Sequence, residues 1–359
     1  MMVLGIDPHK KSHTVVALEA ATGKVLAELT VAADRRGHER LIAWARGLGP
    51  ERRFALEDCR HVSGRLERAL IAAGEGCVRV PPKLMAQTRR SARTRGKSDV
   101  IDAACVARAA LREPDLPEAR LAGPERELRL LVDHRSDLVG ERTRLQSRLR
   151  WHLHDLDLGF EVPPKALGRA CWLARLEEEL APRPGVQARI ARELVARCRT
   201  LSAEISGLGR EIAVLAEELA PELLALPGCG ALSAASLLGE TAGAKRFASA
   251  ARFAMHAGVA PLPVSSGQSN RHRLNRRGNR QLNAALHRIA LTQLRMHGPA
   301  QAFVARKRAE GKSTREALRC LKRHLARIVW QELRCAEARR EALSLCKDPL
   351  VRPALPLAS

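Results

Sequence analysis

Tyrosine is missing from this 359-residue sequence, and aromatic residues make up only 3% of it. Without tyrosine the protein cannot cleave DNA through a phosphotyrosine, so recombination, relaxation and rolling-circle nicking by that route are excluded. The scarcity of aromatic side chains also argues against a base-stacking surface of the kind that RRM and OB domains present.

The sequence also lacks the patterns of metal-binding cysteines, membrane helices and secretion signals. Its nine cysteines are scattered singly, with no Cys-x-x-Cys pair. We therefore expect the cysteines to be small core residues of a protein in a reducing cytoplasm, without a structural zinc site. No run of 18 or more apolar residues occurs, which argues against a membrane partner. The first residues lead into an apolar strand pattern rather than a signal peptide.

Acidic residues are few relative to basic ones: 39 Asp and Glu against 62 Lys and Arg give a formal net charge of +23. This excess indicates a polyanionic partner, because Lys and Arg gain affinity by displacing counterions from phosphates. The cations cluster at 89–97 and 271–280, although a charge run can also be a solvated face. The residues predicted to contact nucleic acid are Lys10, Arg89, Arg90, Arg93, Arg95, Lys97, Arg271, Arg273, Arg276, Arg277 and Asn279.

The first 112 residues alternate strand and helix patterns. Strands are expected at 3–6, 14–18, 25–31, 54–57 and 77–80, and helices at 39–46, 63–73 and 98–111. Three consecutive strands followed by strand–helix alternation is the element order of the RNase H fold. A generic α/β domain would share much of this pattern. We predict an RNase H-like α/β domain over residues 1–112.

Four carboxylates lie at the ends of these expected elements. Asp7 and Glu57 each end an apolar strand. Asp99 and Asp102 begin a helix three residues apart, and ~100° per residue places both side chains on one face. This set suits two Mg²⁺ ions, which prefer carboxylate oxygens and clamp a phosphodiester during in-line displacement. Taken singly, each acid could instead form a turn or cap a helix.

Residues 124–220 are predicted to form an elongated helical connector with a heptad pattern. One heptad position holds Leu194, Leu201, Leu208 and Leu215, and the other holds Cys198, Ile205, Ile212 and Leu219. The pattern fits an antiparallel helical hairpin or a coiled-coil dimer arm. Two ordinary amphipathic helices within one domain would explain it equally well.

A compact, mostly helical domain is predicted at 221–335, followed by a disordered tail at 347–359. Its Leu226–Gly230 segment resembles a helix-hairpin-helix turn that binds phosphate, or it is a plain turn before a core helix. The segment 261–279 is expected to be a loop that carries small residues before its Arg cluster. Such a loop could present a serine hydroxyl to a phosphodiester, although most loops of this composition are simply flexible.

These motifs together resemble the DEDD transposases of bacterial insertion sequences, described as bridge-RNA-guided recombinases, and the related Piv-type DNA invertases. The resemblance rests on the segments 5–10, 55–57, 97–103, 226–230, 253–261, 265–267 and 276–279, in the order of the family. The sequence departs from the family pattern at 267–270 and at Asn275, where other small or basic residues are expected.

The resemblance implies a RuvC-like N-terminal domain, a coiled-coil connector and a C-terminal transposase domain that supplies a nucleophilic serine. Carried over, Asp7, Glu57, Asp99 and Asp102 form the catalytic, metal-binding tetrad. Ser266 is the implied nucleophile, with Ser265 beside it as the alternative. A homo-oligomer (dimer or tetramer), double-stranded DNA and a guide RNA are the implied partners, in the nucleoid of a bacterial cytoplasm.

The function expected from sequence is therefore that of a DNA recombinase of a mobile element, which joins strands through serine with Mg²⁺. One alternative is a RuvC-like structure-selective nuclease that uses metal-activated water. Another is a non-catalytic nucleic-acid-binding protein with a degenerate nuclease fold.

Overall fold

The computed structural model describes residues 1–58, 60–91, 98–113, 116, 118–119, 123–266, 269–273, 275 and 278–347. The chain divides into two compact units. The first comprises Met1–Gly123 with Lys245–Ala248, and the second comprises Pro124–Ala244 with the chain from Ser249 onward. From residue 348 on, the tail predicted to be disordered lies outside the described residues.

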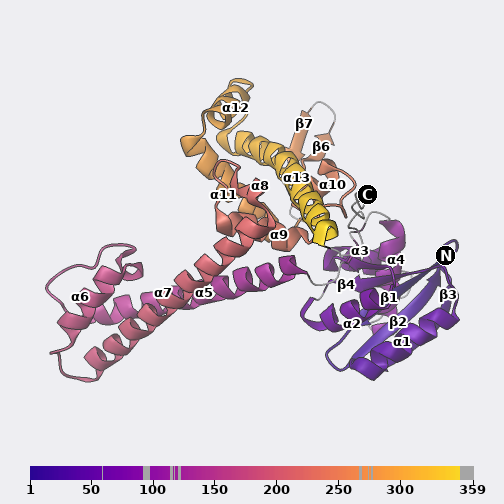
Figure 1. Ribbon diagram of the computed structural model, residues 1–359, viewed down its shortest axis with the longest axis horizontal. Helices are drawn as coiled ribbons and strands as arrows, with labels where there is room; N and C mark the ends of the chain where they lie inside the picture. Colours follow the sequence, from indigo (N-terminus) through magenta and orange to yellow (C-terminus); the bar gives the residue numbers. More distant parts are fainter. Residues whose placement is uncertain are drawn as a thin grey trace, which may run out of the picture. The chain divides into compact units, whose positions relative to one another are not determined.

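The first unit is a mixed sheet with helices on both faces (Figure 1). Its strands are β1 (Met2–Pro8), β2 (Ser12–Glu19), β3 (Val25–Ala32), β4 (Arg52–Glu57) and β5 (Cys77–Val80), and its helices are α1 (Arg35–Gly47), α2 (Arg60–Ala72), α3 (Pro82–Ser91) and α4 (Asp99–Arg112). The strand order is β3-β2-β1-β4-β5. The first three strands pair antiparallel, and β4 and β5 continue parallel to β1. This topology confirms the predicted RNase H-like, RuvC-like fold.

Different helices cover the two faces of this sheet. Because side chains alternate along a strand, Val3 and Gly5 face α4, whereas Leu4 and Ile6 pack with the apolar residues of α1 and α2. The two resulting cores hold the carboxyl ends of β1 and β4 at a fixed place relative to the start of α4.

Among the helices and strands described in this unit, α3 was not expected from the sequence. It begins at Pro82, where a proline costs the helix no hydrogen bond because the first N–H groups have no partner within the helix. Met85 packs its apolar face against the core beside α4. The double proline and the following basic run resemble a loop in sequence, and the helix follows from this tertiary packing.

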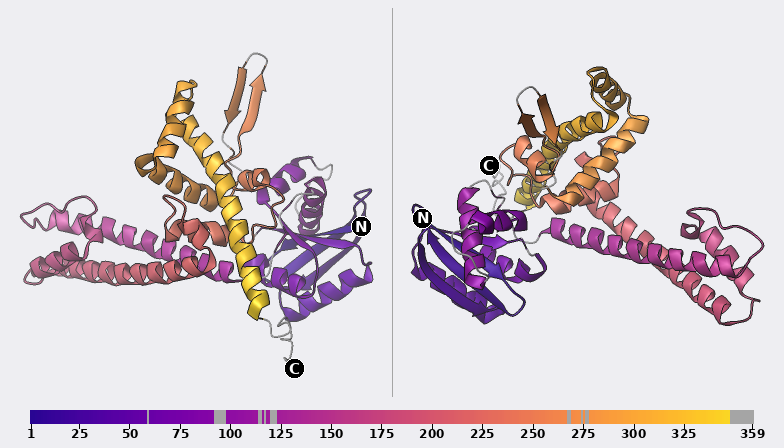
Figure 2. Two further views of the ribbon diagram at one scale, coloured as in Figure 1. Left: turned by 45° about the horizontal axis from the view of Figure 1, so that its top comes forward. Right: turned by 180° about the vertical axis from the view of Figure 1, so that it is seen from behind.

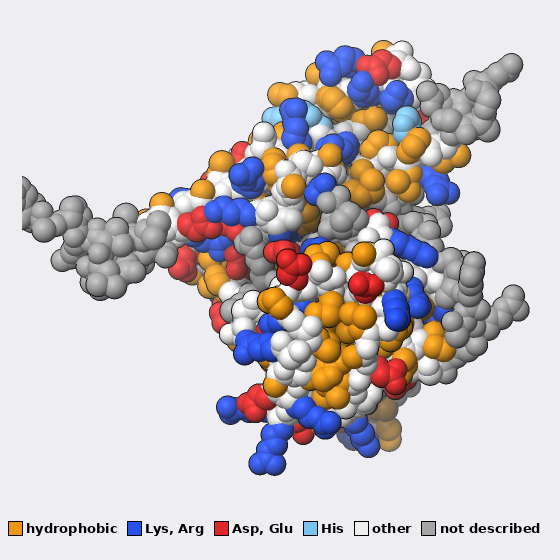
Figure 3. Space-filling model, turned by 90° about the vertical axis from the view of Figure 1, so that its right-hand side faces the viewer, with side chains coloured by type: hydrophobic (Ala, Val, Ile, Leu, Met, Phe, Trp, Pro, Cys, Tyr) orange, Lys and Arg blue, Asp and Glu red, His pale blue; other side chains and the backbone are white. Residues whose placement is uncertain are grey.

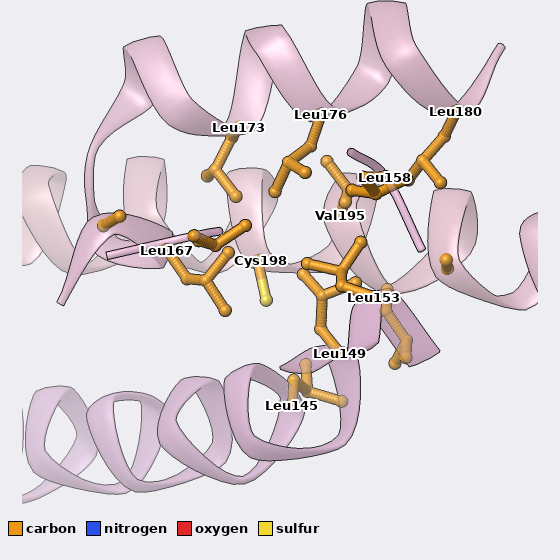
Figure 4. Close-up of a cluster of buried hydrophobic side chains, with 14 of the residues drawn as sticks. Leu145, Leu149, Leu153, Leu158, Leu167, Leu173, Leu176, Leu180, Val195 and Cys198 are labelled. Atoms are coloured by element: carbon orange, nitrogen blue, oxygen red, sulfur yellow. The ribbon is translucent and has the colours of Figure 1, made fainter. Parts of the chain in front are cut away.

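The second unit begins with a pair of long helices. Its elements before residue 220 are α5 (Pro124–Asp155), the short 3₁₀ turn η1 (Ala166–Gly168), α6 (Ala170–Leu180) and α7 (Val186–Leu219). Helices α5 and α7 lie side by side, with α6 near the end where they are joined (Figures 1 and 2). Figure 4 shows Leu173 and Leu176 of α6 pointing toward Leu145 and Leu149 of α5.

Most of the predicted heptad residues of α7 are buried by packing within the chain. Cys198, Ile205, Ile212 and Leu219 of α7 are all buried. Leu194 and Leu201 are buried as well. Leu194, Cys198 and Leu201 lie in the core that α7 shares with α5 and α6, and α9 also packs against α7. Within one chain α5 and α7 therefore pack as a helical pair, and the role of this pair as a dimer arm stays a prediction.

The rest of the second unit is mainly helical, as expected. It contains α8 (Pro221–Leu224), α9 (Ala231–Thr241), α10 (Ala250–His256), β6 (Leu262–Ser266), β7 (Ser269–Arg273), α11 (Arg280–Met296), α12 (Gly298–Ala309) and α13 (Thr314–Lys347). Ser313 and Glu316 form the capping box of α13, since the Glu316 Oε2 atom accepts from the Ser313 N–H at 2.9 Å. The boundary predicted at 220/221 between connector and C-terminal domain stays a prediction.

The segment predicted as a loop at 261–279 contains an antiparallel hairpin. Strands β6 and β7 pair from Leu262 opposite Arg273 to Ser266 opposite Ser269 (Figure 2). The sequence did not predict this hairpin, because its small and charged residues do not give the alternation of apolar and polar residues that is typical of a strand. Among the residues that the structure describes, no helix is long and apolar enough to cross a membrane.

Candidate metal centre and nucleic-acid interface

Asp7 and Glu57 lie beside each other at the carboxyl ends of two parallel strands. The register pairs Ile6 of β1 with Leu56 of β4, so the next residues on the two strands are Asp7 and Glu57. Neighbouring strands are about 4.8 Å apart, and paired residues point to the same face. That face is the one covered by α4, because Asp7 is two residues after Gly5. The sheet therefore places both carboxylates toward the start of α4.

Asp99 and Asp102 occupy the first turn of α4, as predicted. Ser98 is the N-cap, and its Oγ atom accepts from the Ile101 N–H at 3.3 Å. The capping role considered for Asp99 therefore belongs to Ser98, which leaves the Asp99 carboxylate exposed at the helix end. Asp102 is only 6% exposed, since it lies one turn further on, over the sheet.

The three aspartates are close enough to influence one another. Burial raises the pKa of Asp7, which is 6% exposed, and the charges of Asp102 and Asp99 raise it further. His9 acts in the opposite direction on the pKa of Asp7. Carboxylates brought together in this way repel one another, and a bound cation relieves that repulsion.

His9 joins these acids, although the sequence analysis did not single it out as a site residue. Its Nε2 atom is 3.2 Å from the Asp7 Oδ2 atom and 3.3 Å from the Asp99 Oδ1 atom. The ligand atoms of Asp7, His9 and Asp99 all lie within 4.8 Å of one another. His9 is the first residue after β1, and the chain turns there so that the imidazole lies over the strand end. Its spacing of two residues from Asp7 was the signal available in the sequence.

We call Asp7, Glu57, Asp99 and Asp102 the acid site. Within the acid site, the Asp7 and Asp99 carboxylates lie with the His9 imidazole at a spacing that fits a divalent cation, which prefers oxygen ligands and accepts an imidazole. The burial of Asp7 and Asp102 strengthens their attraction for a cation, because fewer waters screen the charges. The arrangement can therefore hold a divalent metal ion at the carboxyl ends of β1 and β4.

Arg89, a predicted nucleic-acid contact, lies next to the acid site. Its Nη2 atom donates to the Oδ1 atom of Asp102. Helix α3, which carries Arg89, packs beside α4 and so brings this guanidinium to Asp102. In the structure, Arg89 therefore neutralises part of the charge of the acid site.

The other predicted nucleic-acid contacts have varied surroundings. Lys10 and Arg273 are exposed, whereas Asn279 caps α11 by accepting from the N–H groups of Gln281 and Leu282 at 2.9 and 3.1 Å. The structure does not describe the side chains of the other predicted contacts, which are Arg90, Arg93, Arg95, Lys97, Arg271, Arg276 and Arg277. Lys and Arg side chains occur over the whole face in Figure 3 rather than in one patch.

The backbone of the implied nucleophile ends strand β6. Ser266 pairs with Ser269 at the closed end of the hairpin, and Ser265 pairs with Asn270. The hairpin is part of the second unit and the acid site is part of the first. The two predicted parts of the reaction machinery thus belong to separate units of the chain.

The turn at 226–230 has the geometry that a close backbone approach requires. Gly228 has φ +78°, and an added Cβ would lie 3.1 Å from the Thr292 Cβ atom. Gly230 is the N-cap of α9 and offers no side chain to satisfy the first N–H groups. Gly228 therefore allows the turn to pack against Ile289 and Thr292 of α11.

Comparison with known proteins identifies two transposase regions in the chain. A family model described as "Transposase" matches residues 4–156. A second, described as "Transposase IS116/IS110/IS902 family", matches residues 220–305.

Curated relatives extend the similarity over nearly the whole length. The "Insertion element IS900 uncharacterized 42 kDa protein" of Mycobacterium paratuberculosis is 30% identical over 385 residues, which cover 92% of this chain and 95% of that protein. The "Insertion element IS116 uncharacterized 44.8 kDa protein" of Streptomyces clavuligerus is 28% identical, covering 92% and 94%. Among solved structures, Thermus thermophilus RuvC in complex with a Holliday junction substrate matches 33% of this chain and 99% of its own, with 15% identity and a TM-score of 0.27.

Proposed function

Because the chain belongs to the IS116/IS110/IS902 family of transposases, and is thus a DNA transposase of an insertion element, we propose that it exchanges DNA strands by Mg²⁺-dependent serine chemistry. The observation that carries the proposal is the convergence of four carboxylates at the carboxyl ends of β1 and β4 and the start of α4. Asp7, Glu57, Asp99 and Asp102 are the proposed ligands of two Mg²⁺ ions. These ions supply Lewis-acid stabilisation of the charge that develops on a phosphodiester.

Residues around the acid site position its carboxylates for metal binding. Gly5 lets α4 approach β1 closely, which keeps Asp102 near Asp7. Ser98 caps α4 and leaves Asp99 free of the cap. His9 contacts both Asp7 and Asp99 and orients them toward a common point.

Ser266 is the proposed nucleophile. Its Oγ atom would form a bond to phosphorus while the bond from phosphorus to one deoxyribose oxygen breaks. The serine loses its proton and the leaving oxygen gains one, so the step is a transesterification that conserves the phosphodiester. A hydroxyl of the exchanged DNA strand would reverse it. Ser265 is the alternative nucleophile.

Several features of the assembly belong to the same proposal. The chain would bind double-stranded DNA and an element-encoded guide RNA, and would act as a homo-oligomer in the nucleoid. An oligomer would let the acid site of one subunit meet the serine of another, since these lie in separate units. The proposed domains are the RuvC-like domain at 1–112, the connector at 124–220 and the transposase domain at 221–335.

A trapping experiment tests the serine chemistry. Purified protein, with any co-purified RNA retained, is incubated with Mg²⁺ and labelled DNA from the gene's own flanks. A denaturation-resistant protein–DNA adduct is expected for the wild type and for Ser265→Ala, but not for Ser266→Ala. Adduct loss only in Ser265→Ala would transfer the role to that residue. Mg²⁺-dependent nicking without an adduct would contradict serine catalysis and indicate hydrolysis by a RuvC-like nuclease.

A further inference from the structure

A cavity of about 660 Å³ lies at the base of the β6–β7 hairpin, against the N-terminal half of α13. We call it the lysine pocket. Its basic lining residues are His272, Arg273, Lys312, Arg319, Lys322 and Arg323. Among its described lining residues only Glu316 is acidic, and this carboxylate is already engaged by the Ser313 N–H and hydroxyl at 2.9 and 2.7 Å. The pocket is therefore strongly positive.

Lys322 is the buried cation of this pocket. Only 7% of it is exposed, and its Nζ atom donates to the Oδ1 atom of Asn283. The Asn283 Nδ2 atom donates to the carbonyls of Ala257 and Gly258 at 3.1 and 3.0 Å. These bonds fix the amide orientation, so that its oxygen faces Lys322. Asn283 accepts only one of the three hydrogens that an ammonium group offers.

The charged neighbours of Lys322 are also cationic or basic. Burial lowers the pKa of Lys322, and the charge of Arg319 lowers it further. On α11, burial and then the charge of Lys322 lower the pKa of His287. In the described part of the chain, no carboxylate forms an ion pair with Lys322. A buried cation without a counter-charge is costly, and an anion in the pocket would remove that cost.

We propose that the lysine pocket binds a backbone phosphate of the DNA that flanks the reaction site. Lys322 would provide a point charge from the wall, while the guanidinium groups of Arg319 and Arg323 would bind phosphate oxygens from the rim. Lys322, Arg319 and Arg323 lie beyond the region matched by the second family model, residues 220–305.

The position of the pocket favours DNA as the source of the phosphate. Arg273 of the pocket pairs with Leu262 at the open end of the hairpin. Leu262 lies four residues before Ser266 on the same strand. At about 3.3 Å per residue this is roughly 13 Å, the axial rise of about four nucleotides. A phosphate in the pocket would therefore lie a few nucleotides from one attacked at Ser266. The choice of DNA over RNA rests on the proposed role of the serine.

Inorganic phosphate tests the pocket without requiring strand transfer. Phosphate, titrated against chloride at constant ionic strength, should raise the Tm of the wild type, because a ligand that binds only the folded state stabilises it. Lys322→Met should reduce this shift by more than half while leaving the phosphate-free Tm unchanged or higher. Arg327→Gln, an exposed control on the same helix outside the pocket, should keep the full shift. Equal shifts in the wild type and Lys322→Met would overturn the proposal.

A salt titration with nucleic acid identifies the source of the phosphate. For a labelled DNA duplex, Lys322→Met and the exposed-site variant Arg319→Gln should each reduce the salt slope of log K by about 1, as expected for one lost phosphate contact. Arg319→Gln also keeps the test valid if Lys322→Met does not fold. Lys322→Arg should restore part of the slope. A slope reduced only for a structured RNA would overturn the assignment to DNA, whatever the outcome of serine trapping.

Discussion

Gly5 of β1 lies so close to α4 that a Cβ atom added to it would be 2.2 Å from the carbonyl oxygen of Ala103. The same Cβ atom would be 2.4 Å from the backbone nitrogen of Ala107. Helix α4 thus packs its backbone directly onto the strand that carries Asp7. This contact fixes the distance between Asp7 and Asp102, and the acid site depends on it.

Gly5→Ala should therefore damage both the stability and the acid site of the first unit. Because backbone atoms cannot move away as a flexible side chain can, we expect a loss of at least about 1–3 kcal/mol in the free energy of unfolding. Urea denaturation measures it. Gly47→Ala is the matched control, since nothing lies within 4 Å of its added Cβ. Equal stability of the two variants would contradict the close packing.

Arg89→Gln should tighten Mg²⁺ binding, because it removes a cation that competes for Asp102. The Arg89 side chain is 42% exposed, so solvent screens its charge. We therefore expect only a roughly 2- to 5-fold lower Kd, in the range of a surface ion pair. Calorimetric titration with Mg²⁺ measures the change. Arg36→Gln, an exposed arginine on α1, should leave the Kd unchanged, and weaker binding by Arg89→Gln would contradict the competition.

The buried pair His13 and His38 predicts a loss of stability in acid. Their Nε2 atoms are 3.2 Å apart, and burial lowers the pKa of His13 from 6.5 to about 4 and also lowers the pKa of His38. Above pH 6.5 both states of the protein keep His13 neutral. Between pH 6.5 and 4 the unfolded chain binds a proton that the folded chain resists. The free energy of unfolding should therefore fall as the pH falls, by up to about 1.4 kcal/mol per pH unit for His13.

Denaturation with urea at pH 7.5 and 5.0 checks this pH dependence. In His13→Gln the fall between the two pH values should be smaller than in the wild type. His154→Gln, a variant of an exposed histidine on α5, should behave like the wild type. The same fall in all three proteins would show that the histidine pair does not cause it.

The connector should be a self-contained packed structure. Leu149 of α5 is fully buried at 0% exposure within the core that α5, α6 and α7 share. Leu149→Ala should lower the free energy of unfolding by about 2–5 kcal/mol. Leu130→Ala, at 55% exposure on the same helix, should change it by less than about 0.5 kcal/mol. If both variants lost little, the apolar stripe would not be a folded core.

Much of the first unit could be predicted from sequence because its signals are local. Apolar strands that end in Asp7 and Glu57, and the cap at Ser98, each depend on a few neighbouring residues. Helix α3 and the β6–β7 hairpin could not be predicted in this way. Their pattern is polar, and α3 takes its place through packing of Met85 against the core.

The candidate site was also predictable only in part. The four acids follow from strand ends and helical spacing, but His9 joins them through the turn after β1. Arg89 meets Asp102 only because α3 packs beside α4. The lysine pocket combines β7 with α13, and no local pattern shows that Lys322 is buried.

The most direct test of the acid site is Mg²⁺-dependent strand transfer by Asp7→Asn and Asp102→Asn, with DNA binding measured in parallel. Loss of a metal ligand removes several kcal/mol of transition-state stabilisation, so strand transfer should fall at least roughly 100-fold. DNA binding should stay within about 2-fold of the wild type, as should both activities of the exposed control Asp137→Asn. Wild-type strand transfer in Asp7→Asn, or equal loss of binding and transfer, would contradict a metal-holding acid site.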